Sequence, residues 1–363
     1  MKKTILLLSL IAIFSSCTKQ SSDDILINGF DDHYNEENAP QSSFIGQIEV
    51  IPLTSEHKSV VLTNPQKIVS YENRFYILDN NRLFCYGPSG KFIRFIGERG
   101  HGHGEYINIA TFVVSDHTIR LLDSFKNTLI AFTTDGDFIS ETDAPEGILS
   151  NVADAVFETD DLLFMTNYIY NDQNEIYTRW NISTGEVSVV DKTPVKTNET
   201  KESVGKHACC NYNGNIRYIL PFSDRIKSTN DQAIRFQTAK KVLTDSDLQR
   251  VTDFSIMTYA EHLDDFVGFN NIFETSNYIL LTFSDMEYTV VDKKSNTCFR
   301  SNYKYDEHPA SFPLLNILSS KEDTLIGMID MEYHRNLKSK IQSYMNTPCD
   351  MESGYVLILY HTK

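Results

Sequence analysis

The sequence predicts an all-β protein that folds as a single six-bladed β-propeller with short helical insertions. A repeated group of short strands, rich in Ile, Leu, Phe and Tyr and joined by glycine-containing turns, is the main reason. The first copy comprises residues 74–79, 82–86, a turn at 87–90 and 91–96, and the second comprises 119–123, 128–132, a turn at 133–136 and 137–139. Asp79 and Asp123 are 44 residues apart, and Gly90 and Gly136 are 46 residues apart. A period of about 40 to 50 residues corresponds to one four-stranded blade.

Weaker copies of the same pattern continue to the C-terminus. They comprise 162–165 with 177–181 and a turn at 183–186, a fourth copy from 216–220, a fifth at 278–283 and 288–292, and a last one at 323–328 and 355–360. The alternating strand 46–53 precedes the first full copy, and we expect it to close the ring, because pairing the two chain ends protects open edge strands.

Two segments do not have the pattern of a blade. Residues 246–265 begin with Ser246 and Gln249 in the spacing of a helix cap, so a short helical excursion is expected there. Residues 334–344 are expected to form another.

The N-terminus has the pattern of an export signal. Lys2 and Lys3 precede an apolar run at 5–14, which is about half the length of a membrane-spanning helix. The run ends at Phe14-Ser15-Ser16-Cys17, which resembles a lipobox with Phe14 in place of the usual Leu. We therefore expect a signal peptide over 1–16, acylation at Cys17, a polar tether over 17–43 and a propeller domain over 44–363. The lipid bilayer of the outer membrane would be the partner of acylated Cys17, with the protein exposed at the cell surface or facing inward.

Composition excludes several classes of protein. The formal net charge of −16 and the lack of a Lys/Arg cluster argue against a nucleic-acid partner. Five cysteines besides Cys17 are scattered through the chain without zinc-type spacing, so buried thiols are favoured over a disulfide framework or a zinc site. No nucleophile elbow, zinc-protease helix, P-loop or dinucleotide fingerprint is present.

These residues also carry a family resemblance. The segment Tyr76-Ile77-Leu78-Asp79, the turn at 90–93 and the glycine-rich stretch 100–106 resemble the six-bladed, NHL-like β-propeller lipoproteins of Bacteroidota. The stretch 269–283 is similar to that family as well, whereas Ser353-Gly354-Tyr355 departs from the Asn-Pro pair that the family often places before its last strand. The resemblance implies a six-bladed propeller on a lipid anchor in the cell envelope.

One stretch offers a metal-site hypothesis. His101, His103 and Glu105 alternate between glycines, so in an extended chain they project to one side and could hold a divalent metal. The alternative, which we favour, is a structural turn in which the glycines supply the conformation and Glu105 and Tyr106 lock it by hydrogen bonding and packing. No other cofactor is expected.

Repeated aspartates favour structure over catalysis. Asp79, Asp123 and Asp292 each end a strand, and repetition at the blade period predicts carboxylates that cap the following turns. Asp154, Asn167 and Asn271 are the candidates for a calcium site of the lactonase type in the propeller channel, although nothing in the sequence places these three together.

Aromatic side chains suggest where a ligand would bind. Tyr106, Tyr168, Tyr170 and Trp180 are the candidates for exposed platforms of a sugar site, although strand positions also consume large apolar side chains for the core. The sequence therefore favours a non-enzymatic envelope module that binds a glycan, a peptide or a partner protein. The alternative is a metal-dependent hydrolase or lyase with its site in the channel.

Overall fold

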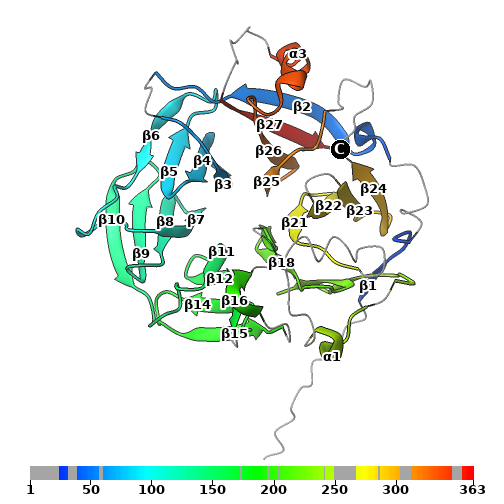
Figure 1. Ribbon diagram of the computed structural model, residues 1–363, viewed down its shortest axis with the longest axis horizontal. Coiled ribbons are helices and arrows are strands. Elements are labelled where there is room, and N and C mark those ends of the chain that lie inside the picture. The colour runs from blue at the N-terminus through cyan, green and yellow to red at the C-terminus, as the bar shows by residue number, and fades with distance from the viewer. Residues whose placement is uncertain are drawn as a thin grey trace, which may run out of the picture.

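Six small antiparallel sheets stand around a central axis in the computed structural model of the chain (Figure 1). The structure describes residues 24–31, 39–56, 60–171, 174–193, 197–202, 205, 207–240, 242–248, 267–284, 287–302, 312–345 and 354–363. The six-bladed propeller predicted from the repeat is confirmed. Cys17 and the expected signal peptide lie outside the described residues.

The blades follow one another along the chain, each running from an innermost to an outermost strand. Blade 1 comprises β3 (Pro65–Tyr71), β4 (Arg74–Asp79), β5 (Arg82–Tyr86) and β6 (Phe92–Ile96). Blade 2 comprises β7 (Ile109–Ser115), β8 (Thr118–Asp123), β9 (Thr128–Thr133) and β10 (Phe138–Asp143). Blade 3 comprises β11 (Val152–Thr159), β12 (Leu162–Asn167), β14 (Tyr177–Asn181) and β15 (Val187–Asp191).

The second half of the ring is less regular. Blade 4 comprises β17 (Cys209–Tyr212), β18 (Asn215–Ile219), β19 (Arg225–Ser228) and β20 (Ile234–Phe236). Blade 5 comprises β21 (Asn271–Glu274), β22 (Tyr278–Ser284), β23 (Glu287–Asp292) and β24 (Thr297–Asn302). In blade 6, β25 (Ile317–Lys321), β26 (Thr324–Asp330) and β27 (Tyr355–Thr362) are followed by β2 (Ile45–Pro52). A separate ribbon of β13 (Ile169–Asn171) and β16 (Thr197–Glu202) extends from blade 3.

The ring closes by pairing its two ends, as the sequence predicts. β2, from the N-terminal side, runs antiparallel to the C-terminal strand β27 from the pair Ile45 and Thr362 to the pair Pro52 and Val356. The N-terminal strand β1 (Ile25–Ile27) pairs in parallel with β20 and extends blade 4 to five strands. Part of the segment expected as a polar tether is thus built into the propeller, because Ile27 and Phe30 are each only 1% exposed.

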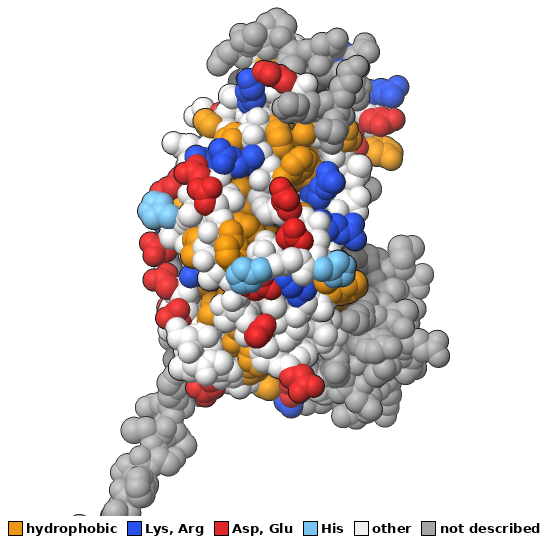
Figure 2. Space-filling model, turned by 90° about the vertical axis from the view of Figure 1, so that its left-hand side faces the viewer, with side chains coloured by type: hydrophobic (Ala, Val, Ile, Leu, Met, Phe, Trp, Pro, Cys, Tyr) orange, Lys and Arg blue, Asp and Glu red, His pale blue; other side chains and the backbone are white. Residues whose placement is uncertain are grey.

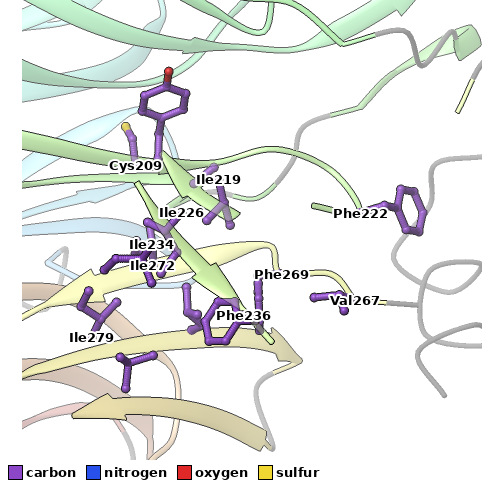
Figure 3. Close-up of a cluster of buried hydrophobic side chains, with 14 of the residues drawn as sticks. Cys209, Ile219, Phe222, Ile226, Ile234, Phe236, Val267, Phe269, Ile272 and Ile279 are labelled. Atoms are coloured by element: carbon purple, nitrogen blue, oxygen red, sulfur yellow. The ribbon is translucent and has the colours of Figure 1, made fainter. Parts of the chain in front are cut away.

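The core lies between neighbouring blades rather than in one central mass. One cluster joins apolar side chains of blades 1 and 2, and another joins blades 2 and 3 around the fully buried Trp180. Figure 3 shows the largest cluster, in which Ile226 and Phe236 of blade 4 pack with Ile272 and Ile279 of blade 5. Burying both faces of each sheet explains why the strands have nearly continuous apolar runs.

Turn capping by the strand-ending aspartates is confirmed in two of the three blades where it is predicted. The Asp123 carboxylate accepts the backbone N–H groups of Phe125 and Lys126 at 2.9 and 3.0 Å. That of Asp292 accepts the N–H of Lys294 at 2.8 Å. The Asp79 carboxylate caps no described N–H of the following turn. It accepts N–H groups of Thr63 and Asn64, in the segment that leads into β3.

Both expected helical insertions are present in the described part. α1 (Asp245–Leu248) begins one residue before Ser246, and its cap is Thr244, whose hydroxyl accepts the Asp247 N–H at 3.3 Å. The remainder of that segment, up to residue 265, lies outside the described residues. The segment 334–344 forms the 3-10 turn η3 (Arg335–Leu337) and α3 (Lys338–Ser343).

Candidate binding site in the propeller channel

The innermost strands of all six blades meet around one cavity. Its volume is about 320 Å³, within the range of small-molecule sites. The lining residues are Lys67–Val69 of β3, Val113–Ser115 of β7, Ala155–Phe157 with Asp154 of β11, His207 and Cys209–Asn211 of blade 4, Ile272 and Phe273 of β21, and Leu318–Ser320 of β25. The walls therefore combine apolar side chains with a few polar groups.

Three of these blades place a polar residue at the same level of the channel. In β3, β7 and β11, the first residue pairs with the last residue of the neighbouring strand of the same blade. The second residue is bulged out, and regular pairing resumes at the third. The bulges leave Lys67, Thr111 and Asp154 at equivalent positions, 44 and 43 residues apart. Lys67 and Thr111 were not among the sequence-predicted site residues, although their spacing at the blade period is a signal that could have found them.

These three side chains form one buried hydrogen-bonded group across blades 1, 2 and 3. The Lys67 ammonium donates to Asp154 Oδ1 at 2.6 Å, to the Ala155 carbonyl at 2.8 Å and to Thr111 Oγ1 at 3.2 Å. Asp154 Oδ1 also accepts from the Thr111 hydroxyl and from the Ala155 N–H, both at 2.8 Å. All three ammonium protons have acceptors, so Lys67 is a fixed cross-link between blades rather than a free amine.

His207 faces this group from blade 4. Its Nδ1 lies 3.9 Å from Asp154 Oδ2, the carboxylate oxygen that Lys67 does not contact. Burial raises the pKa of Tyr168, and the negative charge of Asp154 raises it further. Asp154 and His207 are thus polar groups beside which a ligand in the cavity would lie.

The three side chains considered for a calcium site point to different partners. The Asn167 amide donates to the Glu175 carbonyl and to Thr178 Oγ1, at the end of β12. The Asn271 oxygen accepts the His207 N–H at 3.0 Å. Asp154 is held by Lys67. Within the described ranges, no three His, Cys, Asp or Glu side chains come close enough to hold a metal ion.

Two cysteines line the channel, Cys209 buried and Cys210 partly exposed. Burial raises the pKa of Cys209 to about 12, and it raises the pKa of Cys210 well above its usual range. A thiol in this state is protonated at neutral pH and is a poor nucleophile. Cys209 instead packs with its sulfur 3.3 Å from Thr166 Oγ1.

A second buried ionic group lies between blades 4 and 5. The Glu274 carboxylate, 3% exposed, contacts Arg217 Nε and Lys293 Nζ, each at 2.9 Å. The Lys293 ammonium also lies 4.5 Å from the centre of the Tyr212 ring. This network joins blades 4 and 5 and is a structural counterpart of the Lys67 group.

The glycine-rich stretch at 100–106 forms a pinned turn at the outer rim of blades 1 and 2. The Glu105 carboxylate accepts the Gly102 N–H at 2.8 Å, and the Gly100 N–H donates to the Tyr106 carbonyl at 2.9 Å. His103 Nδ1 lies 3.2 Å from Glu141, and its side chain is 75% exposed. His101 is also exposed. The structural turn is confirmed, while a metal held by His101, His103 and Glu105 stays a prediction.

The four aromatic candidates lie in different environments. Tyr106, at the end of that turn, is 2% exposed and lines a hollow there. Tyr168 is half-buried, and the charge of Asp154 contributes to its raised pKa. Trp180 is 0% exposed. It therefore lacks the solvent-exposed ring face that a sugar platform requires. Tyr170 lies in β13, and its side chain is outside the described part.

The fold defines the class of this protein as a six-bladed β-propeller with a small central cavity. A family model described as a domain of unknown function, DUF4934, matches residues 27–348, and the chain belongs to that family. The narrower assignment to NHL-like lipoproteins stays a prediction. No protein of curated function matches the chain. In the described residues no helix is long and apolar enough to cross a membrane.

Two solved structures are similar in fold. A Bacteroides fragilis protein described as exported aligns with a TM-score of 0.66 and 17% identity, covering 90% of this chain and 97% of its own. A member of the DUF4221 family from Bacteroides vulgatus aligns with a TM-score of 0.52 and 12% identity, covering 88% of this chain and 97% of its own. At these identities the likeness concerns the fold.

Proposed function

We propose that this protein is an exported, non-enzymatic binding module whose ligand enters the propeller channel. The cavity between the six inner strands carries the proposal, because it is concave and lined by apolar side chains together with fixed polar groups. A glycan, a peptide or a loop of a partner protein would fit this description.

The state of the polar groups favours binding over catalysis. The Lys67 ammonium donates hydrogen bonds to three acceptors, and the thiols of Cys209 and Cys210 are protonated at neutral pH. Asp154 Oδ2 and His207 line the cavity and would orient a ligand hydroxyl or amide. The same pair would serve the alternative, a hydrolase or lyase, if a metal joined it.

The cellular address is part of the proposal. Export and acylation at Cys17 rest on the apolar run at 5–14 and the lipobox-like residues that follow it. The fold it shares with an exported Bacteroides protein supports an address outside the cytoplasm. We place the propeller on the outer membrane, held by the lipid and exposed at the cell surface.

A channel-filling variant tests the proposed site. Purified protein is screened against arrays of glycans and peptides, and each hit is repeated with Ser319→Trp, which puts an indole into the cavity. The same substitution at Ser188, exposed on the outer strand β15, is the control. We expect Ser319→Trp to abolish binding and Ser188→Trp to preserve it, with both variants melting cooperatively. Equal binding by both variants would place the ligand outside the channel.

A further inference from the structure

A second hollow lies at the outer rim, remote from the channel. It has a volume of about 820 Å³ and lies between the outer edges of blades 1 and 2, where the 97–106 turn packs beside Phe138 of β10. We call it the rim groove and define it by Arg82, Phe95, Arg99, Tyr106 and Phe138. Figure 2 shows this side of the ring, with exposed apolar side chains between charged ones.

Two arginines of the rim groove have no acidic partner among the described residues. Arg82 and Arg99 are both exposed and line the groove as well as a smaller hollow of about 470 Å³ beside it. Neither guanidinium forms an ion pair within the part of the chain that the structure describes. Arg74 and Lys126 of the same two blades both contact carboxylates. Unpaired arginines are unexpected on a chain with 49 acidic and 33 basic side chains.

A buried phenol lies between these two charges. Tyr106 is 2% exposed, yet it lines the rim groove, and its hydroxyl makes no hydrogen bond to any described residue. Burial raises the pKa of Tyr106, and the charges of Arg82 and Arg99 each oppose that rise more strongly than Glu98 adds to it. The hydroxyl is therefore available to donate to a ligand oxygen in the groove.

The neighbouring acidic groups are engaged or point into solvent. Glu105 is turned onto the Gly102 N–H. Glu141 contacts Lys126 at 2.5 Å and His103 at 3.2 Å. Glu98 is exposed at the groove margin. The two guanidiniums and the phenol hydroxyl are therefore the donors at the groove that have no acidic partner among the described residues.

Aromatic rings border the same donors. The Arg82 guanidinium lies over the Phe95 ring at 5.3 Å, which holds its planar fork in place. Phe138 is 41% exposed on the opposite wall, with its ring 5.0 Å from that of His103. Exposed rings beside charged donors suit a ligand that has an apolar ring face and an anionic group.

We propose that the rim groove binds an acidic saccharide through its oxyanion, a carboxylate or a sulfate ester, with Arg82, Arg99 and the Tyr106 hydroxyl as donors and Phe138 against the sugar ring. This site is independent of the channel ligand proposed above. Hydrogen bonds to a charged group are stronger than those to a neutral one, so we expect a preference of tenfold or more over a neutral saccharide.

Isothermal titration of the full chain with three saccharides tests the proposal. The probes are trigalacturonate, a sulfated galactose trisaccharide and neutral galactotriose, each at 50 mM and 500 mM salt and pH 7. Arg82→Gln/Arg99→Gln and Tyr106→Phe are compared with Arg335→Gln/Lys294→Gln, which removes the same charge from two exposed residues of blades 5 and 6. The channel variant Ser319→Trp is included to separate this site from the first.

We expect an acidic probe to bind at least tenfold more tightly than galactotriose, and more weakly at high salt. The double-arginine variant should lose this preference, and Tyr106→Phe should weaken binding severalfold, whereas the charge control and Ser319→Trp should bind as the wild type does. Tighter binding of trigalacturonate would identify the oxyanion as a carboxylate, and tighter binding of the sulfated trisaccharide would identify it as a sulfate ester. Equal binding of acidic and neutral probes, or an equal loss in the charge control, would overturn the proposal.

Discussion

Replacing Lys67 with Met tests whether the channel group holds the blades together. The change removes a buried cation that bonds Asp154, Thr111 and the Ala155 carbonyl, and it keeps a similar side-chain length. The side chains of Lys67 and Asp154 are 12% and 5% exposed, so the carboxylate would be left buried without its counter-charge. Removing one partner of a buried ion pair costs about 3–5 kcal/mol.

The expected shift follows from the size of the chain. Unfolding entropy of about 2.1 cal/mol/K per residue gives roughly 0.7 kcal/mol/K for a propeller of this length. The loss of stability therefore lowers Tm by about 4–7 °C in a calorimetric melt. The exposed pair of Lys192 and Glu175 provides the control, and Lys192→Met should shift Tm by less than about 1 °C.

A double variant separates the charge from the packing. Asp154→Asn added to Lys67→Met removes the uncompensated carboxylate, so the pair should recover part of the lost Tm. A Tm for Lys67→Met that matches that of Lys192→Met would refute the reasoning, because Lys67 would then be a solvated amine free for other chemistry.

Three further predictions concern the frame around the channel. Gly90 has φ +77° and its Cβ would lie 2.1 Å from the Pro52 carbonyl oxygen, so Gly90→Ala should lower Tm by several degrees, measured against Gly185→Ala, where the space is open. Because the raised pKa of about 12 keeps the Cys209 thiol protonated, iodoacetamide should leave Cys209 unmodified at pH 8 in native protein and label it after denaturation, as read by peptide mass spectrometry. The buried Tyr177 hydroxyl donates to the Ile219 carbonyl at 2.6 Å, so Tyr177→Phe should cost about 1–2 kcal/mol in denaturant unfolding, and no loss would contradict that role.

The ring could be predicted from the sequence because its repeat is local. Each signal indicates a single blade or the closure of the ring. The signals are the strand-ending Asp79 and Asp123, the turn glycines Gly90 and Gly136, and the alternating strand at 46–53. These signals depend on turn chemistry and on side-chain alternation, which short stretches of sequence encode.

The site was harder to predict because it arises between blades. Lys67 and Thr111 are unremarkable until the bulges in three sheets align them with Asp154. Tyr106 was expected as an exposed ring, but the structure buries it beside Arg82 and Arg99, which the sequence pattern alone does not reveal. The incorporation of Ile27 and Phe30 into blade 4 was missed, since a short apolar run inside a polar segment gives little periodicity.

The fate of a bound ligand tests the central claim most directly. Each saccharide or peptide that binds the wild type but not Ser319→Trp is incubated with stoichiometric protein for a day, with and without added Ca²⁺, and then analysed by mass spectrometry. A non-enzymatic binding module returns the ligand unchanged in both samples, with one equivalent bound. Cleaved or eliminated product that appears with the wild type and is absent with Asp154→Asn would contradict the account and establish catalysis in the channel.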